Sequence, residues 1–595
     1  MSRLAAPAVL FALLAALGWW AIEPGLFTID EPNHLAMVVS LRHGSLSPVG
    51  LEGLRPSREL AYFEPRFAQP AMAVPPHRLP PLYAFIAWPF SLLGVRGLFW
   101  LNLVATLGTC VLVFRLVRRH AARRGSAWLA VVAFGLGSYT LEYALGLWPH
   151  MLSALLCTAA VVLATTARER DAPRIAAAAG LVAGLAIGVR YPNVVYAAAV
   201  GLGLLLWAPR RWASALSFGA GALPPVAAIA WINDLRLGSA NPVSKGGSYT
   251  RLGAGPGDGG PGLLRDAAEA FWFRVVDYSA RPNGSFPGFV IEPDPRSGAY
   301  LWWDVVKKAW LQSSPWVALV LVACFLAFLP RSRGGRPGRA ALLRSLALVI
   351  GAGVALFSLA GSARTDGTCF NQRYLLDVTP LAAVVLALHV DGLTLPRPAP
   401  LLAALAAGAL SGGALAWRAI AALQPPESHL AIMHFPLALA ALLLLARGLY
   451  DRTGPIARLA FAALLAASLT WAAAVHLGTD LRFTHARRAL LAELWEQSRG
   501  RLPSGSAVLT WGQYRNVVVP LQLEQELLVV DAARDHGRTA AQLVQDLLRR
   551  GTRVFILTEG FDPRVRVALS ERFGPVRIIR GPLGFAELAG TGDKR

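Results

Sequence analysis

Charged residues are scarce in this chain of 595 residues. They make up 15% of the sequence, and 55% of the residues are hydrophobic, whereas soluble domains carry about a quarter charged residues. The apolar residues fall in blocks of about 17–20, the length that a helix needs to cross the hydrocarbon core of a bilayer. The sequence therefore predicts a polytopic membrane protein that spans as helices, because lipid satisfies no backbone polar group.

Cysteine frameworks and nucleotide-binding motifs are also missing. The cysteines Cys110, Cys157, Cys324 and Cys369 follow neither a disulfide nor a zinc spacing, and no GxGxxG or P-loop motif occurs. We predict no cofactor and no metal site, and a divalent metal stays an open alternative. The net charge of +22 comes without a basic stripe of interleaved aromatics, so nucleic acid is not an expected partner.

The topology follows from the hydrophobic blocks and the loop charges. We predict about 13 spans, at residues 4–22, 97–117, 127–145, 150–168, 174–190, 193–208, 213–232, 309–329, 341–361, 374–390, 398–417, 430–446 and 457–476. Residues 80–95 are interpreted as a helix at the outer interface, because the run is short and contains prolines. With that choice every arginine-rich loop faces the cytoplasm, as the positive-inside rule requires.

Two domains result from this topology. Residues 1–478 are predicted to form an all-α membrane domain with outer loops at 23–96 and 233–308. Residues 479–595 are predicted to form a small extracytoplasmic α/β domain, because β-rich runs alternate with helical stretches. The β-rich runs are 507–511, 527–530, 553–557 and 576–579, and the helical stretches are 539–550 and 563–573.

Two adjacent carboxylates, Asp30 and Glu31, follow the first predicted span. At the mouth of a transmembrane helix they have water and lipid within reach, which suits a base that joins a water-soluble acceptor to a lipid-carried donor. Asp is also a favoured helix cap and Pro32 suits a first turn, so a capping role for Asp30 is a compatible alternative. His34 lies one turn further on the same face, as a structural residue or a substrate contact.

Two arginines are candidates for binding a phosphate. Arg78 precedes the proposed interfacial helix, where a guanidinium can hold a lipid phosphate through paired hydrogen bonds; a snorkelling arginine is the structural alternative. Arg373 and Tyr374 stand at the outer end of the tenth span, a position where charge is often functional. An i,i+4 ion pair between Arg373 and Asp377 is the alternative there.

Two further outer span ends carry polar residues next to aromatic ones. His150 follows Trp148, and Arg190 precedes Tyr191. Trp148 and Tyr191 also fit an ordinary aromatic belt. All of these candidate groups fall on one side of the membrane in a topology that was derived from loop charges alone.

These pieces resemble the GT-C-type membrane glycosyltransferases, which include the protein O-mannosyltransferases and the bacterial transferase that adds aminoarabinose to lipid A. The matching elements are Asp30-Glu31 after the first span, Tyr62 to Pro65, the stretch from Arg78 to Tyr83, and the helix ends at Arg190–Pro192 and Arg373–Tyr374. The chain departs from the pattern at His34, where an aromatic is usual, and at Leu79, which separates Arg78 from the prolines.

The resemblance implies an enzyme of a bacterial inner membrane that moves a sugar from a polyprenyl phosphate to an envelope lipid, glycan or protein on the outer face, with inversion. Asp30 maps to the catalytic residue of the family and Arg78 to its contact with the donor phosphate. We hypothesise that Asp30 acts as the general base, that Glu31 orients Asp30 or the acceptor, and that Arg373 is a second phosphate ligand. The remaining expected substrate contacts are His34, Tyr83, His150, Arg190, Tyr191 and Tyr374.

A flippase or transporter of a lipid-linked sugar is the alternative function. It would use the same basic site, and it should show charges near span midpoints and repeats that alternate access. Few mid-span charges occur here, which favours an outer-face enzyme. An interaction protein that merely anchors the α/β domain would need far fewer spans.

Overall fold

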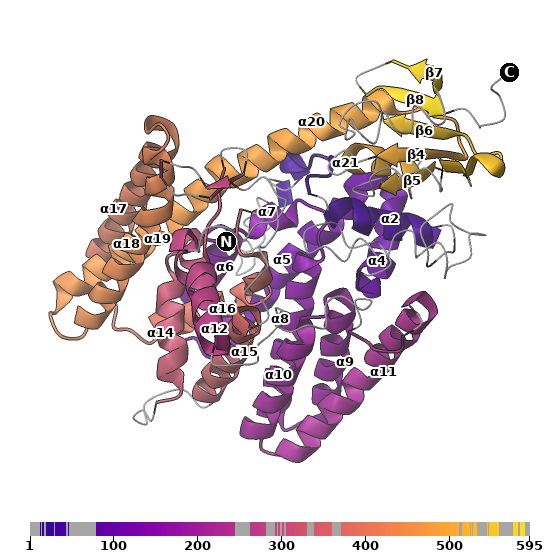
Figure 1. The fold of residues 1–595 in the computed structure, drawn as a ribbon. Coiled ribbons are helices and arrows are strands. Elements are labelled where there is room, and N and C mark those ends of the chain that lie inside the picture. Colours follow the sequence, from indigo (N-terminus) through magenta and orange to yellow (C-terminus); the bar gives the residue numbers. More distant parts are fainter. Residues whose placement is uncertain are drawn as a thin grey trace.

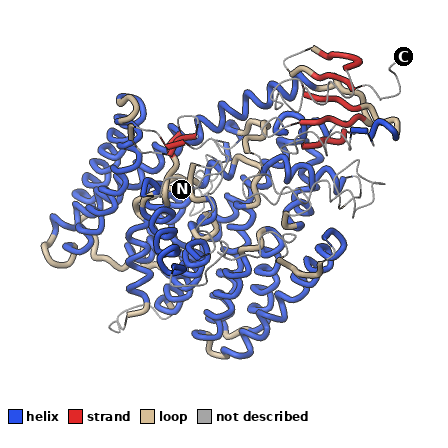
Figure 2. The backbone as a smooth tube through the Cα atoms, in the orientation of Figure 1, coloured by secondary structure: helices blue, strands red, loops and turns tan. Residues whose placement is uncertain are grey.

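A computed structural model gives the fold. It describes residues 19–28, 30–42, 79–237, 239–243, 262–280, 305–329, 338–359, 370–510, 515–523, 527–531, 547–557, 575–580 and 583–588, with a few isolated residues and short pieces between these ranges. Helices form most of the described chain, and strands gather mainly at its C-terminal end (Figure 2). The predicted fold class, a helical membrane domain with a small α/β domain, is confirmed.

The helical part has the composition of a multi-pass membrane protein. Within the described ranges, seven helical stretches are long and apolar enough to cross a bilayer, and five shorter apolar helices accompany them. The seven are Pro81–His120, His150–Arg170, Arg211–Arg236, Arg339–Leu359, Pro398–Ala422, Glu427–Leu449 and Pro455–Ser498. The count of about 13 spans stays a prediction.

The first described helices pack around a chain reversal. They are α2 (Asp30–Arg42), α4 (Pro81–Ala87), the 3-10 helix η2 (Trp88–Leu93) and α5 (Gly94–His120). Gly94 has a φ of +74°, a conformation that favours glycine. A Cβ on Gly97 would lie 2.2 Å from the Phe90 carbonyl oxygen, so η2 packs back against the first turn of α5, and residues 81–93 form elements distinct from α5. Their place at the membrane interface stays a prediction.

The other helices follow in sequence (Figure 1). They are α6 (Gly125–Gly135), α7 (Thr140–Ala144), α8 (His150–Arg170), α9 (Pro173–Val189), α10 (Asn193–Trp207), α11 (Arg211–Leu237), α12 (Gly262–Phe271), α13 (Trp310–Ser313), α14 (Val317–Ala327), α15 (Arg339–Leu359), α16 (Thr379–Asp391), α17 (Pro398–Trp417), α18 (Glu427–Leu449), α19 (Pro455–Val475), α20 (Arg482–Ser498) and α21 (Arg515–Val518). The side chains of α16 are buried from Leu381 to Leu388, so this helix lies at the centre of the bundle.

Small residues allow the closest helix contacts. A Cβ on Gly221 of α11 would lie 1.9 Å from the Ala177 carbonyl oxygen of α9, and a Cβ on Gly408 of α17 would lie 2.0 Å from the Ala463 carbonyl oxygen of α19. Backbones therefore touch at these positions. Because lipid is as apolar as the side chains, such close packing is a main source of attraction between helices in a membrane.

Two predicted spans are broken in the structure. The span predicted at 127–145 splits into α6 and α7, and the one at 309–329 splits into α13 and α14. The breaks meet, because the Ser314 hydroxyl and the Trp316 indole both donate hydrogen bonds to the Gly137 carbonyl oxygen, at 3.1 and 2.7 Å. Non-helical backbone is tolerated where protein satisfies it in this way, which hydropathy alone does not predict.

The C-terminal domain is built on a five-stranded sheet in the order β5-β4-β6-β8-β7. Its strands are β4 (Ser506–Thr510), β5 (Leu527–Asp531), β6 (Val554–Leu557), β7 (Pro575–Ile579) and β8 (Phe585–Leu588). β4 pairs in parallel with β5 and β6, and β8 pairs antiparallel with β6 and β7. The four predicted β-rich runs are strands, β8 was missed, and the predicted helix at 563–573 lies outside the described residues.

Three shorter strands, β1 (Glu292–Pro293), β2 (Tyr300–Trp302) and β3 (Val305–Val306), form a separate antiparallel sheet in the order β1-β2-β3. The predicted outer loop 233–308 thus contains α12 and this sheet, with other parts of it outside the described residues.

Helix α20 runs from the bundle to the sheet, and α2 lies beside the sheet (Figure 1). The Arg42 guanidinium at the end of α2 donates a hydrogen bond to the Leu523 carbonyl oxygen of the C-terminal domain, at 3.3 Å. We call the end of the bundle that carries α2, α7 and α20 the site end.

The opposite end gathers arginine-rich turns. Asp391 accepts hydrogen bonds from the Ala122 and Arg123 backbone N–H groups and from the Arg339 guanidinium. The Arg168 guanidinium donates to the Gly338 carbonyl oxygen at 3.2 Å. Both α5 and α8 run from the site end to this arginine end, so the basic turns after these helices lie far from α2.

The α9–α11 contact gives a test of the packing. We expect Gly221→Ala to destabilise the protein by about 1–3 kcal/mol, because the added methyl group meets backbone that cannot move aside. Gly219→Ala on the same helix is the control, since a Cβ there has nothing within 4 Å. Thermal unfolding of the two variants in detergent measures the difference, and equal stability would contradict this packing.

Candidate active site

Asp30 and Arg373 meet at the site end although 343 positions separate them in the sequence. The Arg373 Nη1 atom lies 2.7 Å from the Asp30 Oδ2 atom, and the two side chains are 12% and 27% exposed. Asp30 begins α2, and Arg373 begins the 3-10 turn η5 (Arg373–Leu375). A partly exposed carboxylate is thus held next to a guanidinium at the edge of the bundle.

Aromatic rings surround the guanidinium of Arg373. Its central carbon lies 5.0 Å from the ring centre of Trp148 and 5.1 Å from that of Tyr374. The Tyr374 ring stacks on Phe357 with centres 5.0 Å apart. These contacts fix the plane of the guanidinium and favour its positive charge.

The alternative ion pair between Arg373 and Asp377 is not the arrangement found. Asp377 pairs with Arg190 instead, and both side chains are buried. The reason is local, because residues 373–378 form a 3-10 turn and further turns and α16 begins only at Thr379. The i,i+4 spacing of a helix therefore does not apply there. Arg190 also lies 5.8 Å from the Tyr374 ring centre, so its pair borders the Arg373 group.

His34 is buried one turn after Asp30. Its ring stands edge-on to Tyr83 with centres 5.0 Å apart, and the Tyr83 hydroxyl accepts a hydrogen bond from the Asn102 amide at 3.2 Å. Burial lowers the pKa of His34 from 6.5 to about 4, with the nearby Arg373 and Arg190 guanidinium groups adding to the effect and Asp30 opposing it. The imidazole is therefore uncharged near neutral pH.

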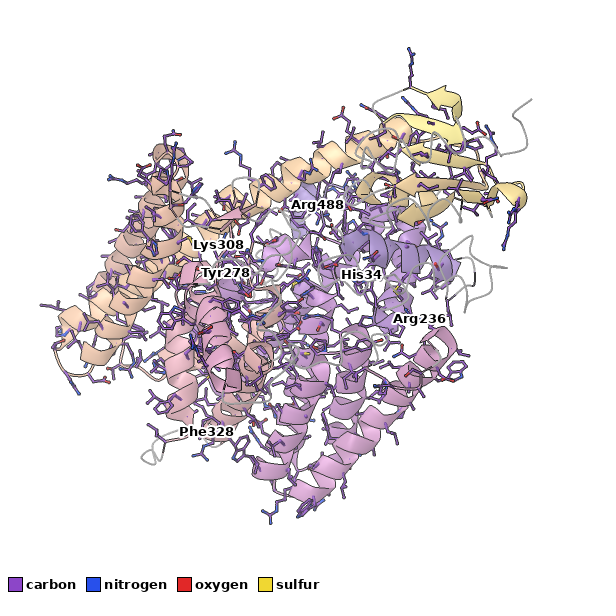
Figure 3. All side chains as sticks on the ribbon, in the orientation of Figure 1. His34, Arg236, Tyr278, Lys308, Phe328 and Arg488 are labelled. Carbon is purple, nitrogen blue, oxygen red and sulfur yellow. The ribbon has the colours of Figure 1, made fainter. Side chains whose placement is uncertain are left out.

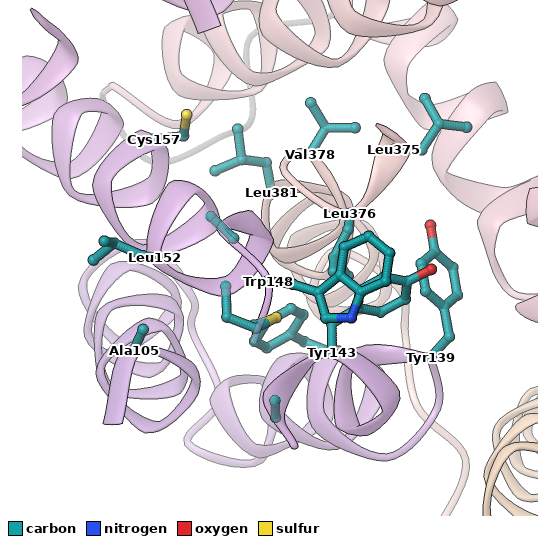
Figure 4. Packing of buried hydrophobic residues seen from close by; sticks show 14 of the residues in the cluster. Ala105, Tyr139, Tyr143, Trp148, Leu152, Cys157, Leu375, Leu376, Val378 and Leu381 are labelled. Carbon is teal, nitrogen blue, oxygen red and sulfur yellow. The ribbon is translucent and has the colours of Figure 1, made fainter. Parts of the chain in front are cut away.

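His150 begins α8 and is 4% exposed. Its ring lies 5.4 Å from both Tyr143 and Trp148, measured between centres. Figure 4 shows Tyr143 and Trp148 packed beside the turn that carries Leu376. Neither ring nitrogen of His150 has a hydrogen-bond partner in the part of the chain that the structure describes. Buried polar groups are nearly always bonded, so this imidazole is a candidate for binding a substrate hydroxyl.

Glu31 is fully enclosed, in contrast to Asp30. Its side chain is 0% exposed. Its carboxylate accepts hydrogen bonds from the backbone N–H groups of Phe27, Thr28 and Leu147 and from both terminal nitrogens of Arg488. Five donors leave this carboxylate no free capacity for a substrate, so its contribution is to hold the chain on either side of Asp30.

Tyr191 faces a different neighbour. Its hydroxyl donates to the Asn233 amide oxygen at 3.3 Å, near the end of α11. Arg236, one turn further, donates to the Leu79 carbonyl oxygen at 3.1 Å. Sequence reasoning missed Arg236, which lies beside the residue that follows Arg78. Arg78 itself and the element from Tyr62 to Pro65 lie outside the described residues.

A buried polar network lies beside Arg373 and was also missed. Lys308 donates to Asp480 at 2.8 Å, and the Asn371 amide donates to Asp480 at 2.9 Å and to Glu142 at 2.8 Å. Figure 3 labels Arg488, a residue of α20, together with Lys308 and His34, which lie below it in that view. The only sequence signals were Lys307-Lys308 before an apolar run and an acidic residue after the last predicted span.

No cluster of three or more His, Cys, Asp or Glu side chains in the described ranges is arranged to hold a metal ion. The described site brings together the partly exposed Asp30 carboxylate, the Arg373 and Arg190 guanidinium groups and the imidazole rings of His34 and His150.

No protein-family model and no curated protein matches the sequence. Solved structures do match. The crystal structure of ArnT from Cupriavidus metallidurans bound to undecaprenyl phosphate aligns with a TM-score of 0.51 and 16% identity, covering 98% of each chain. The apo state of that protein aligns with a TM-score of 0.50 and 13% identity, again over 98% of each chain. The chain thus has the fold of the GT-C-type membrane glycosyltransferases, and the resemblance found in its motifs is confirmed at the level of the fold.

The Arg190–Asp377 pair gives a stability test. Arg190→Met leaves the Asp377 carboxylate buried without its cation, which costs about 3–5 kcal/mol. Adding Asp377→Asn removes the uncompensated charge, so the double variant should be more stable than Arg190→Met alone. Thermal unfolding of both variants checks this, and a double variant less stable than the single one would contradict the pairing.

His34 gives a pH test. Its pKa is about 4 in the folded protein and 6.5 in an unfolded chain, so between these values the unfolded state binds more protons. Stability should therefore fall as the pH drops from about 6.5 to about 4, by up to about 3 kcal/mol from this residue. The non-titrating variant His34→Gln should show a shallower fall of the melting temperature over that window. Parallel curves would show that His34 does not titrate as expected.

Proposed function

We propose that this chain is an inner-membrane glycosyltransferase that moves a sugar from a polyprenyl-phosphate donor to an envelope acceptor on the outer face, with inversion. The observation that carries the proposal is the contact between Asp30 and Arg373, which joins a base and a phosphate-binding group at one point. The shared fold with ArnT, which has been crystallised bound to undecaprenyl phosphate, supports a lipid phosphate as the donor carrier.

Asp30 accepts the proton of the acceptor hydroxyl, as a general base. The oxygen forms a bond to C1 of the sugar from the face opposite the phosphate. The bond from C1 to the phosphate oxygen breaks, and its electron pair leaves with the lipid phosphate. Arg373, with Arg78, stabilises the charge that grows on this leaving group. No nucleotide takes part, because the lipid phosphate already carries the activated sugar.

The neighbouring residues have supporting roles in this scheme. His150, whose ring nitrogens have no hydrogen-bond partner among the described residues, and the uncharged His34 contact sugar or acceptor hydroxyls. Tyr83 packs against His34. The Arg190–Asp377 pair and Tyr374 hold Arg373 in place. Tyr191 orients the end of α11, where Arg236 provides a further guanidinium near the donor phosphate. Glu31 acts by positioning the chain around Asp30.

The outer-face orientation is supported by charge. The basic turns at 118–124 and 168–170 lie at the arginine end, opposite α2. Basic loops stay in the cytoplasm, so the site end, including the C-terminal domain joined to it through α20, faces outward.

Asp30→Asn should lower transfer by about 10²- to 10⁴-fold while the melting temperature stays close to that of the wild type, because the amide oxygen still accepts a hydrogen bond from Arg373. The assay uses the full chain in nanodiscs, a panel of radiolabelled undecaprenyl-phosphate hexoses and pentoses, and envelope extract as acceptor. Asp234→Asn, at an exposed carboxylate on α11, is the control. Turnover by Asp30→Asn at the wild-type rate would remove Asp30 from the mechanism.

The same assay distinguishes an enzyme from a flippase. An enzyme transfers label to the extract in nanodiscs, which enclose no compartment, whereas a flippase moves lipid across a vesicle membrane and leaves the sugar on its carrier. Flipping without transfer would reject the proposed function.

A further inference from the structure

The stretch that joins the last bundle helix to the C-terminal domain carries two buried charges. It consists of the π-helix η7 (His476–Leu481) followed by α20. Asp480 and Arg488 are each 1% exposed. They are eight positions apart, which corresponds to about 12 Å along a helix, so both can face the bundle. A segment that merely connects two domains does not need two buried ionised side chains, because withdrawing each from water is costly.

Arg488 contacts the chain on both sides of Asp30. Its two terminal nitrogens bind Glu31 at 2.7 and 3.3 Å, and one of them also donates to the Gly25 carbonyl oxygen at 2.7 Å. The contact is tight, since a Cβ on Gly146 would lie 2.7 Å from the nearer guanidinium nitrogen. Glu31 in turn accepts the Leu147 N–H at 2.8 Å. Arg488 thus holds Asp30 and the segment that leads to Trp148.

Asp480 binds the side chain of Asn371, two residues before Arg373. Its carboxylate accepts the Asn371 amide at 2.9 Å and Lys308 at 2.8 Å, and it lies 3.0 Å from the His476 Nδ1 atom. The Arg373 N–H donates to the Asn371 carbonyl oxygen at 2.9 Å. The position of the Arg373 backbone is therefore tied to η7 through one intervening residue.

We infer that the η7–α20 stretch is a brace that sets the separation of Asp30 and Arg373, with Arg488 and Asp480 as positioning residues for the transfer reaction. One continuous helical stretch holds the chain on each side of the ion pair. If the contacts of Arg488 or of Asp480 are lost, the Asp30 carboxylate and the Arg373 guanidinium keep their chemistry but are no longer held at the right distance and orientation. The inference rests on the proposed function.

The test begins at Arg488. Arg488→Met keeps much of the side-chain volume and removes every donor, and Arg488→Lys keeps the charge but not the paired geometry. We expect kcat per folded molecule to fall about 10- to 100-fold in Arg488→Met, with an intermediate value in Arg488→Lys. Binding of undecaprenyl phosphate, measured by native mass spectrometry, should stay within about threefold of the wild type. Arg482→Met, at an exposed arginine of the same helix, is the control and should match the wild type.

Two further variants test the mechanism of the effect. The double variant Glu31→Gln/Arg488→Met should have a kcat no lower than that of the slower single variant, because both substitutions disrupt the same contact between Glu31 and Arg488. Asp480→Asn should lower kcat by a larger factor than it weakens the binding of undecaprenyl phosphate, to which Arg373 also contributes, and Glu493→Gln, at an exposed carboxylate on α20, is its control. If Arg488→Met does not fold, Arg488→Lys and Asp480→Asn decide the question.

The inference is overturned by wild-type kcat in the folded Arg488 and Asp480 variants. It is equally overturned if the variants lose undecaprenyl-phosphate binding in proportion to activity, or if the Glu31 and Arg488 effects multiply. In each of these cases an inactive Asp30→Asn variant leaves the proposed function standing. A wild-type chain that transfers no sugar, or an active Asp30→Asn variant, removes the proposed function instead.

Discussion

A charge that is withdrawn from water must meet an opposite charge or several hydrogen-bond donors, and at the site end this requirement decides which segments touch. Each of four ion pairs joins segments that are far apart in the chain. The pairs are Asp30–Arg373, Arg190–Asp377, Glu31–Arg488 and Lys308–Asp480. Together they connect α2 with α20 and with the turn before α16, that turn with the end of α9, and η7 with the segment before α13. The site is therefore assembled by the same contacts that hold this end of the bundle together.

The features that local sequence determines were predictable. Hydropathy located the long helices, and β-rich runs located β4 to β7, because each element shows its own pattern within a few residues. Loop charge placed Asp30 and Arg373 on the same side without any knowledge of their contact. The structure then shows them 2.7 Å apart. A one-dimensional pattern can thus predict that two residues lie at the same end of a helical bundle, although not that they touch.

The features that depend on tertiary partners were not predictable. Asp30 and Glu31 look alike in the sequence, yet one carboxylate is partly exposed and the other is enclosed by five donors, because Arg488 arrives from more than 450 positions away. Arg373 stood at the outer end of a predicted span, with Asp377 four residues on as its alternative partner, but residues 373–375 form a 3-10 turn and Asp377 pairs with Arg190. β8 has a sequence with little β-propensity pattern and becomes a strand between β6 and β7. In each case the decisive neighbour is remote.

The meeting of the two helix breaks has a consequence for how such a chain can diverge. The Gly137 carbonyl oxygen in one break is satisfied by Ser314 and Trp316 in the other. A one-residue insertion in either break would separate the Gly137 carbonyl oxygen from its two donors and leave a buried polar group without a hydrogen bond. Homologous chains should therefore change the lengths of these two stretches only in concert, so an alignment gap in one should accompany a gap in the other.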